Sequence, residues 1–443
     1  MTRHALRAAA LTFRSDPFLT DPAGSYTYYP DALIVIEEGR IASIADAATV
    51  QAPAGVPVSH FENALILPGF IDTHVHYPQT EMIASFGAHL LEWLEKYTYI
   101  TEQKFSDRTH AGKVAHVFLR ELLRAGTTTA AVYCTVHPQS VDAFFEESAR
   151  FNTRMIAGKV LMDRNAPEAL RDTAESGYAE SKALIEKWHN KGRQLYAITP
   201  RFAGSCSEAQ LDAAGLLWNE HPGTYMQTHL CETRDEIAWV QTLFPDSASY
   251  LDVYHRAKLT GPRAIFGHAV HVNEEDFAQC HQTGSALAHC PTSNLFLGSG
   301  LFRAFDAKKK SRPVRLGLGT DIGAGTSFSQ LATLNEAYKV AALNDTRLSA
   351  AHAFYLATRG GAEALYLDNI IGSIQPGYEA DLVVLDLKAT PLLDFRSGFC
   401  RNVLEQLFVL MTLGDDRAVR ATYVAGEAVY VRDRPDMFAY PGR

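Results

Sequence analysis

The sequence predicts an α/β protein: a (β/α)8 barrel of the TIM type with a small β-sandwich domain formed by both chain termini. The middle of the 443-residue chain alternates short apolar segments with longer amphipathic ones, a pattern typical of parallel strands joined by helices. Both ends carry paired strand segments with turns between them. The chain also exceeds the roughly 250–300 residues at which one core stops growing. The expected parts are residues 1–66 and 374–443 for the sandwich and 67–373 for the barrel.

The terminal segments have the composition of β-hairpins. Each apolar, β-branched run is short and is interrupted by residues that favour tight turns. A lone hairpin is only marginally stable in water, so these pieces are expected to join in one domain. The expected strands lie within residues 32–46, with a turn at Glu38 and Gly39, within 379–387, and within 421–431, with a turn at Ala425, Gly426 and Glu427.

Eight apolar segments in the middle of the chain each predict one strand of the barrel. Segments with helical periodicity, such as residues 178–192, separate most of them. Eight strand–helix units that close into a parallel barrel are the natural arrangement of this pattern. The expected strands are residues 70–76, 127–133, 155–163, 195–202, 225–232, 264–272, 285–291 and 315–321.

Composition excludes several classes of protein. No apolar run approaches the roughly 18–20 residues of a membrane span, and the first residues are expected to form structure, not a targeting peptide. The net charge of −9, with both signs interspersed, argues against a nucleic-acid partner. The one basic run, residues 308–315, is expected to be a solvated loop. Six cysteines without paired spacing indicate a reduced, cytoplasmic setting.

Polar residues recur where the predicted strands end, which is where barrels of this type carry their chemistry. His74 and His76 are two residues apart and therefore share one face of the first strand. His229 ends the fifth strand and Asp321 the eighth. Each alone has an ordinary explanation as a core or surface residue, but together they favour a site. Three histidines and a carboxylate suit zinc or ferrous iron, and a free position for water would make the site catalytic.

Further residues at the strand ends complete the predicted site. Glu232, three residues after His229, is placed to move protons between an activated water molecule and a substrate. Arg201 ends the fourth strand, and His268 ends the sixth. Some metallohydrolases of this architecture bridge two metal ions through a carboxylated lysine on the fourth strand. Lys159 lies on the third predicted strand, so one metal ion per chain is expected.

Several motifs resemble those of the amidohydrolase superfamily over essentially the whole chain: PGFIDTHVH (68–76), HLCE (229–232), FGHAVHV (266–272), GLGTDIGAG (317–325) and GSIQPGYEADLVVLD (372–386). Within that superfamily the chain most resembles the guanine deaminase family. This closer resemblance rests on DTHVHYPQ (72–79), GKVLMD (158–163), TPRFAGSC (199–206), THLCET (228–233) and HCPTSNLFLGSG (289–300).

The resemblance implies a zinc-dependent hydrolysis of guanine to xanthine and ammonia. Water would attack C2, with Glu232 as proton shuttle that protonates N3, Asp321 as base, and His268 bonded to the water or the tetrahedral intermediate. The resemblance also implies a purine base as partner and a homodimer. Iron stays open as an alternative metal, because the same ligands suit both. The implied zinc ligands are His74, His76, His229 and Asp321; the implied substrate contacts are His76, Tyr77, Gln79, Arg201, Phe202, His229, Glu232 and Asp321.

The chemistry of guanine agrees with this assignment. Its O6 and N7 are acceptors and its N1 carries a donor, while Gln79 offers both kinds of group and Arg201 a fork of donors. Phe202 could supply an aromatic wall. Two alternatives remain at this stage. One is another deaminase or chlorohydrolase of the superfamily, acting on a triazine, cytosine or an adenosine-like nucleoside. The other is a non-catalytic assembly protein, although such relatives usually lose metal ligands.

Overall fold

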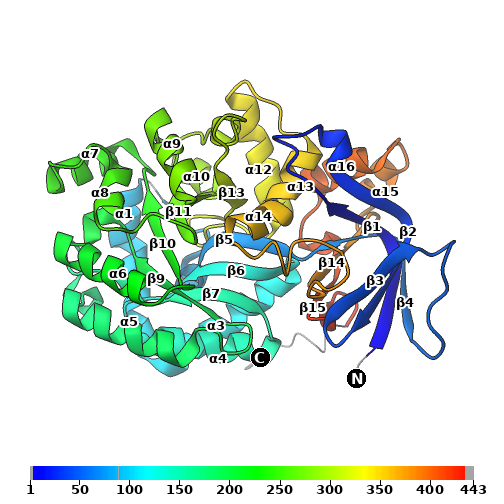
Figure 1. Ribbon diagram of the computed structural model, residues 1–443, viewed down its shortest axis with the longest axis horizontal. Helices are drawn as coiled ribbons and strands as arrows, with labels where there is room; N and C mark the ends of the chain where they lie inside the picture. The colour runs from blue at the N-terminus through cyan, green and yellow to red at the C-terminus, as the bar shows by residue number, and fades with distance from the viewer. Residues whose placement is uncertain (1–2, 88, 435–443) are drawn as a thin grey trace.

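The computed structural model describes residues 3–87 and 89–434, and its centre is the predicted barrel of eight parallel strands (Figure 1). The strands pair in sequence order, with the short β8 (Val160–Leu161) added beside β9. Two hydrogen bonds, Asp321 N–H to His74 O at 2.9 Å and His76 N–H to Ile322 O at 3.1 Å, bring the first strand to the segment after the last. The barrel strands are β5 (Phe70–His76), β6 (Thr127–Tyr133), β7 (Arg154–Gly158), β9 (Leu195–Pro200), β10 (Tyr225–Leu230), β11 (Ala264–His268), β12 (Ala286–His289) and β13 (Arg315–Leu318).

Helices between the strands cover the outside of the barrel (Figure 1). The helix predicted at residues 178–192 begins earlier, at Ala174, because Thr173 and Ser176 form a reciprocal capping box. The helices are α1 (Leu90–Trp93), α2 (Tyr99–Glu102), α3 (Arg108–Arg124), α4 (Pro138–Phe151), α5 (Ala174–Trp188), α6 (Glu208–Glu220), α7 (Arg234–Leu243), α8 (Tyr250–Arg256), α9 (Glu274–Thr283), α10 (Pro291–Phe296), α11 (Ala304–Ala307), α12 (Gln330–Leu343), α13 (Ala350–Ala357) and α14 (Arg359–Ala364).

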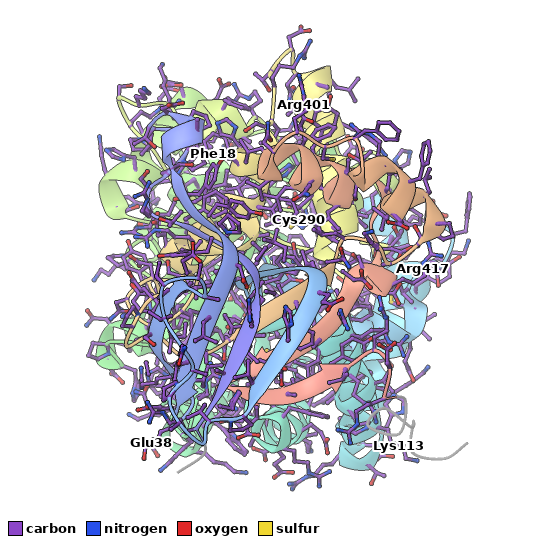
Figure 2. The ribbon with its side chains drawn as sticks, turned by 90° about the vertical axis from the view of Figure 1, so that its right-hand side faces the viewer. Phe18, Glu38, Lys113, Cys290, Arg401 and Arg417 are labelled. Carbon is purple, nitrogen blue, oxygen red and sulfur yellow. The ribbon has the colours of Figure 1, made fainter. Side chains whose placement is uncertain are left out.

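The two ends of the chain meet in a separate sheet, hydrogen-bonded as one seven-stranded ladder in the order β16-β15-β14-β4-β1-β2-β3 (Figure 2). Both predicted turns are confirmed, since Glu38 and Gly39 have φ of 50° and 78°, and Ala425 and Gly426 have φ of 44° and 78°, as a tight hairpin turn requires. The strands are β1 (Arg3–Phe13), β2 (Tyr26–Glu37), β3 (Arg40–Asp46), β4 (Val58–Pro68), β14 (Leu382–Asp386), β15 (Val419–Val424) and β16 (Glu427–Val431).

Each face of this sheet buries apolar side chains. On β4, Leu65 belongs to the large core shared with the barrel, whereas its neighbour Ile66 belongs to a separate cluster of the terminal strands. β1, which begins at Arg3, contributes Leu11 to the large core and Leu6 to the separate cluster, so the described part of the N-terminal segment forms structure, as expected. Between β14 and β15 the chain forms two helices that were not predicted, α15 (Pro391–Ser397) and α16 (Val403–Leu413). The domain boundaries after residues 66 and 373 stay predictions.

The basic run at residues 308–315 is not simply a solvated loop, which corrects the prediction. Lys308 is buried and pairs with Asp16 at 2.5 Å, and buried Arg312 binds Glu274 through two nitrogens at 2.7 and 2.5 Å. Their partners are far away in the sequence, so the run alone could not reveal them. Within the described ranges, no helix is both long and apolar enough to cross a membrane.

Candidate active site

The structure brings the four predicted metal ligands together at the C-terminal end of the barrel. His74 and His76 project from the same face of β5 and are both buried. His229, near the end of β10, places its Nε2 3.2 Å from Nε2 of His76. Asp321, just beyond β13, has its Oδ1 3.4 Å from Nε2 of His74 and 3.4 Å from Nε2 of His76. Three places on the barrel thus supply four groups that converge on one point.

The three histidines are present as neutral bases. Burial lowers the pKa of His74 and takes those of His76 and His229 well below the usual value. Nδ1 of His229 donates to the carbonyl oxygen of Arg201 at 2.7 Å, which fixes the ring so that Nε2 faces the site. Both ring nitrogens of His74 are buried and lack hydrogen-bond partners among the described residues. A neutral imidazole has one ring lone pair, and a bound cation would satisfy the one that His74 leaves without a partner.

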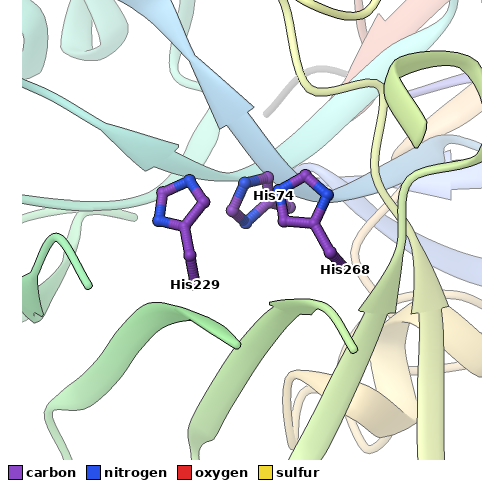
Figure 3. Close-up of side chains that lie close together, drawn as sticks. All are labelled: His74, His229 and His268. Carbon is purple, nitrogen blue, oxygen red and sulfur yellow. The ribbon is translucent and has the colours of Figure 1, made fainter. Parts of the chain in front are cut away.

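Asp321 supplies the negative charge of the cluster. Burial raises the pKa of this carboxyl, but the surrounding imidazoles, that of His74 above all, lower it further, so the pKa lies at about 2. The residue has a φ of 51°, in the left-handed region, where side chains other than glycine are strained and often functional. Three neutral imidazoles with one carboxylate fit zinc or ferrous iron. Figure 3 shows His74 and His229 gathered with His268 at the strand ends.

Two features position His74: hydrogen bonds to Asp72 fix the register of β5, and the absence of a side chain at Gly267 leaves room for the His74 ring. Asp72 is fully buried and accepts hydrogen bonds from the backbone N–H groups of His74 (3.2 Å) and Thr320 (3.1 Å), as well as from the Thr320 hydroxyl. It thereby ties β5 to the residue before Asp321. Gly267 leaves room for a ligand, because a Cβ atom there would lie 2.4 Å from Cε1 of His74. Asp72 was not among the predicted site residues, although its position two residues before His74 puts it on the same face of the strand.

Glu232 and His268 face each other beside the cluster. Oε2 of Glu232 lies 3.5 Å from Nε2 of His268, and its Oε1 accepts from the Ser299 hydroxyl at 3.2 Å. Burial raises the pKa of Glu232 to about 7, so the carboxyl can gain or lose a proton near neutrality. Nδ1 of His268 donates to Oδ1 of Asn294 at 2.8 Å, which leaves Nε2 directed at Glu232. Asn294 is a second positioning residue that the sequence analysis did not identify.

A cavity opens directly onto these groups. The residues that were expected to hold a purine, Gln79, Arg201 and Phe202, line it together with His76, His229, Glu232, His268 and Asp321. Its remaining wall is mostly apolar and comes from residues that the sequence did not single out: Leu90, Trp93, Leu94, Leu297 and Ala324, with Glu236 behind Glu232. A largely apolar pocket with a few convergent polar groups is typical of a small-molecule site.

Two residues considered in the sequence analysis lie elsewhere. The side chain of Tyr77 is not a wall of the cavity, and its contact with the substrate stays a prediction. Its ring packs against Phe105 and Phe144, and its hydroxyl donates to the Ser140 carbonyl at 2.8 Å. His76 and Gln79 line the cavity, whereas Tyr77, which begins the 3-10 turn Tyr77–Met82, points into the core. Lys159 is buried in an ion pair with Asp172 and is therefore engaged away from the histidine cluster.

Comparisons with known proteins agree with this geometry. Residues 65–429 match the model of the amidohydrolase family. The guanine deaminase of Escherichia coli is 52% identical over 93% of this chain and 94% of its own length, and a solved structure of the E. coli enzyme superimposes with a TM-score of 0.94 over 97% of this chain and all of that one. The guanine deaminase of C. acetobutylicum with bound guanine, 28% identical, gives a TM-score of 0.86 over 97% of this chain and all of that one. The chain therefore belongs to the amidohydrolase family and groups there with the guanine deaminases.

Proposed function

We propose that this protein is a metal-dependent deaminase that converts guanine and water into xanthine and ammonia. The observation that carries the proposal is that one cavity is shared by two sets of groups. Three of the expected metal ligands, His76, His229 and Asp321, also line the cavity. The residues expected to bind the purine, Gln79, Arg201 and Phe202, line the same cavity. A metal-activated water molecule and a purine ring would therefore meet there.

The metal would be held by His74, His76, His229 and Asp321, and zinc fits this donor set. When bound, it would lower the pKa of a coordinated water molecule toward neutrality. The proposal includes one metal ion per chain. The neutral imidazoles and the ionised Asp321 support it, and Lys159 is already paired with Asp172.

The residues of this chain then supply the proton transfers. Asp321 accepts a proton from the water as it attacks C2 of the ring. Glu232, whose pKa of about 7 keeps a proton available, protonates N3. The ionised Glu232 then takes the proton of the new hydroxyl group on C2 and delivers it to the exocyclic amine, which leaves as ammonia. The proton held by Asp321 finally returns to Glu232. His268, fixed by Asn294, hydrogen-bonds to the attacking oxygen. The bond from C2 to nitrogen is replaced by one to oxygen, which gives xanthine.

The remaining parts of the proposal are a homodimer and a cytoplasmic location. Exposed Leu392, Phe395 and Phe399 on and beside α15 are compatible with a surface between two subunits. All six cysteines are unpaired, which agrees with a reducing environment. Sedimentation of the purified protein would give its subunit number directly.

A panel of substrates tests the proposed reaction. The purified protein is assayed with guanine, adenine, cytosine and a chlorotriazine, with ammonia and chloride release as confirmation. Rapid conversion of guanine alone, to xanthine and an equal amount of ammonia, is the expected result. Activity confined to another ring would keep the hydrolase and reject the roles of Gln79 and Arg201.

A further inference from the structure

A buried carboxylate lies behind the two side chains that are expected to bind the purine. Glu102, at the end of α2, is fully buried and is not part of the cavity wall. Nη1 of Arg201 donates to its Oε2 at 2.6 Å, and Nε2 of Gln79 donates to its Oε1 at 3.4 Å. Oε1 of Gln79 accepts from the Gly323 N–H at 3.2 Å. One carboxylate thus contacts both residues, and the orientation of the Gln79 amide is fixed from both ends.

The charge of this carboxylate matters as much as its position. Arg201 is almost entirely buried, and Glu102 is the one carboxylate within 4 Å of its guanidinium in the part of the chain described. A buried guanidinium without that partner would present an uncompensated positive charge to whatever occupies the cavity. With Glu102 in place, the pair is neutral overall, and Arg201 acts on the ligand mainly as a hydrogen-bond donor.

We propose that Glu102 is a positioning residue that neutralises Arg201 and so makes the purine subsite prefer the neutral substrate over its more acidic product; this rests on the proposed deamination of guanine. Guanine is uncharged at neutral pH. Replacing its amine by a second ring carbonyl makes xanthine the stronger acid, so xanthine loses a ring proton at a lower pH. A subsite without net charge releases this anion, whereas one with a free guanidinium retains it.

The test compares substrate and product in charge variants of the full-length, zinc-loaded protein. Glu102→Gln keeps the shape of the pair but removes its negative charge. We expect the ratio of the KM for guanine to the inhibition constant for xanthine to rise by about tenfold, the size of one charge-assisted hydrogen bond, and to rise further with pH as xanthine ionises. Glu102→Asp, which retains the charge, should stay near the wild-type ratio.

Two further variants keep the test decisive if Glu102→Gln does not fold. Arg201→Gln leaves the negative charge of Glu102 without its cationic partner. Because this charge repels the xanthine anion, xanthine binding should weaken as pH rises. Glu102→Gln combined with Arg201→Gln should abolish that pH dependence, because both charges are gone. Glu147→Gln, which removes a buried carboxylate on α4 away from the cavity, is the control and should leave the ratio unchanged.

Xanthine binding is also measured by calorimetry, which does not require turnover and so separates the two proposals. If the wild-type protein deaminates guanine but the charge variants bind xanthine with the wild-type ratio and pH dependence, Glu102 is only structural and this inference is wrong, while the proposed reaction stands. If the wild-type protein neither turns over guanine nor binds purines, both proposals are wrong.

Discussion

At the scale of single residues, the site depends on environments that change ordinary side chains. The same burial that keeps three histidines neutral also keeps a proton on Glu232 at pH values where an exposed glutamate is ionised. The pKa of Asp321 is lowered instead, because His74 lies beside its carboxylate. Two carboxyl groups in one cavity therefore have opposite protonation states, which assigns one as acid and the other as base.

Replacing Glu232 by glutamine tests the first of these roles. The amide cannot exchange a proton, so kcat should fall by about 10²–10⁴-fold, the usual contribution of a general acid–base group. Zinc content should not change, because Glu232 is outside the ligand set. Steady-state kinetics and metal analysis on one preparation check both points. A variant with near-normal turnover would remove Glu232 from the mechanism.

The pH profile tests the same group without a mutation. A raised pKa means that Glu232 remains protonated up to about pH 7, so it can donate to the ring below that value. Above it, kcat/KM should fall by about tenfold per pH unit, because only the protonated fraction is active. The measurement is kcat/KM for guanine from pH 5.5 to 9 with the metal saturated. A profile that stays flat from pH 7 to 9 would contradict the role as acid.

At the scale of elements, the strand ends are predictable and the packing around them is not. The alternation on β5 and the recurrence of polar residues after β10, β11 and β13 are visible in the sequence. Glu102 is 99 residues from Arg201, and no local pattern connects the two. The apolar wall around Trp93 comes from short helical turns, α1 and its continuation, which lack the periodicity that identifies a helix.

Gly267 on β11 provides a test at this scale. In Gly267→Ala the new methyl group would lie 2.4 Å from the His74 ring, so the ring must move and zinc affinity should fall by about 10–100-fold. Gly112→Ala is the matched control. It lies in α3 with no atom within 4 Å of the new methyl group, and it should stabilise the helix by about 0.5–1 kcal/mol. Competition with a chelator gives both zinc affinities; equal values would refute the steric argument.

At the scale of the whole molecule, buried ion pairs join the terminal sheet to the barrel. Nη2 of Arg193, before β9, contacts Asp381 at 2.5 Å and Glu379 at 2.7 Å, and Arg154 on β7 also binds Glu379. The sequence predicted that both termini meet in one domain and that eight strands form the barrel. It could not predict this junction, because its charges are at separate places in the chain and only the fold makes them neighbours.

Removing Asp381 tests the importance of that junction. In Asp381→Ala, Arg193 would lose one of its two buried carboxylate partners, and the free energy of unfolding should fall by up to about 3–5 kcal/mol. Asp394→Ala removes the partner of the exposed Lys388 and should change stability by less than about 1 kcal/mol. Denaturant unfolding of the two variants gives the comparison. Equal small losses would mean that the sheet and the barrel do not depend on these charges.

The central claim is that one metal ion, held by His74, His76, His229 and Asp321, enables guanine deamination in this cavity. The most direct measurement removes the metal with a chelator and follows guanine loss by absorbance as zinc is returned in steps. We expect no turnover without metal and a linear recovery that ends at one zinc ion per chain, with xanthine and ammonia formed in equal amounts. Turnover of guanine by the metal-free protein, or recovery that needs two ions per chain, would contradict the account.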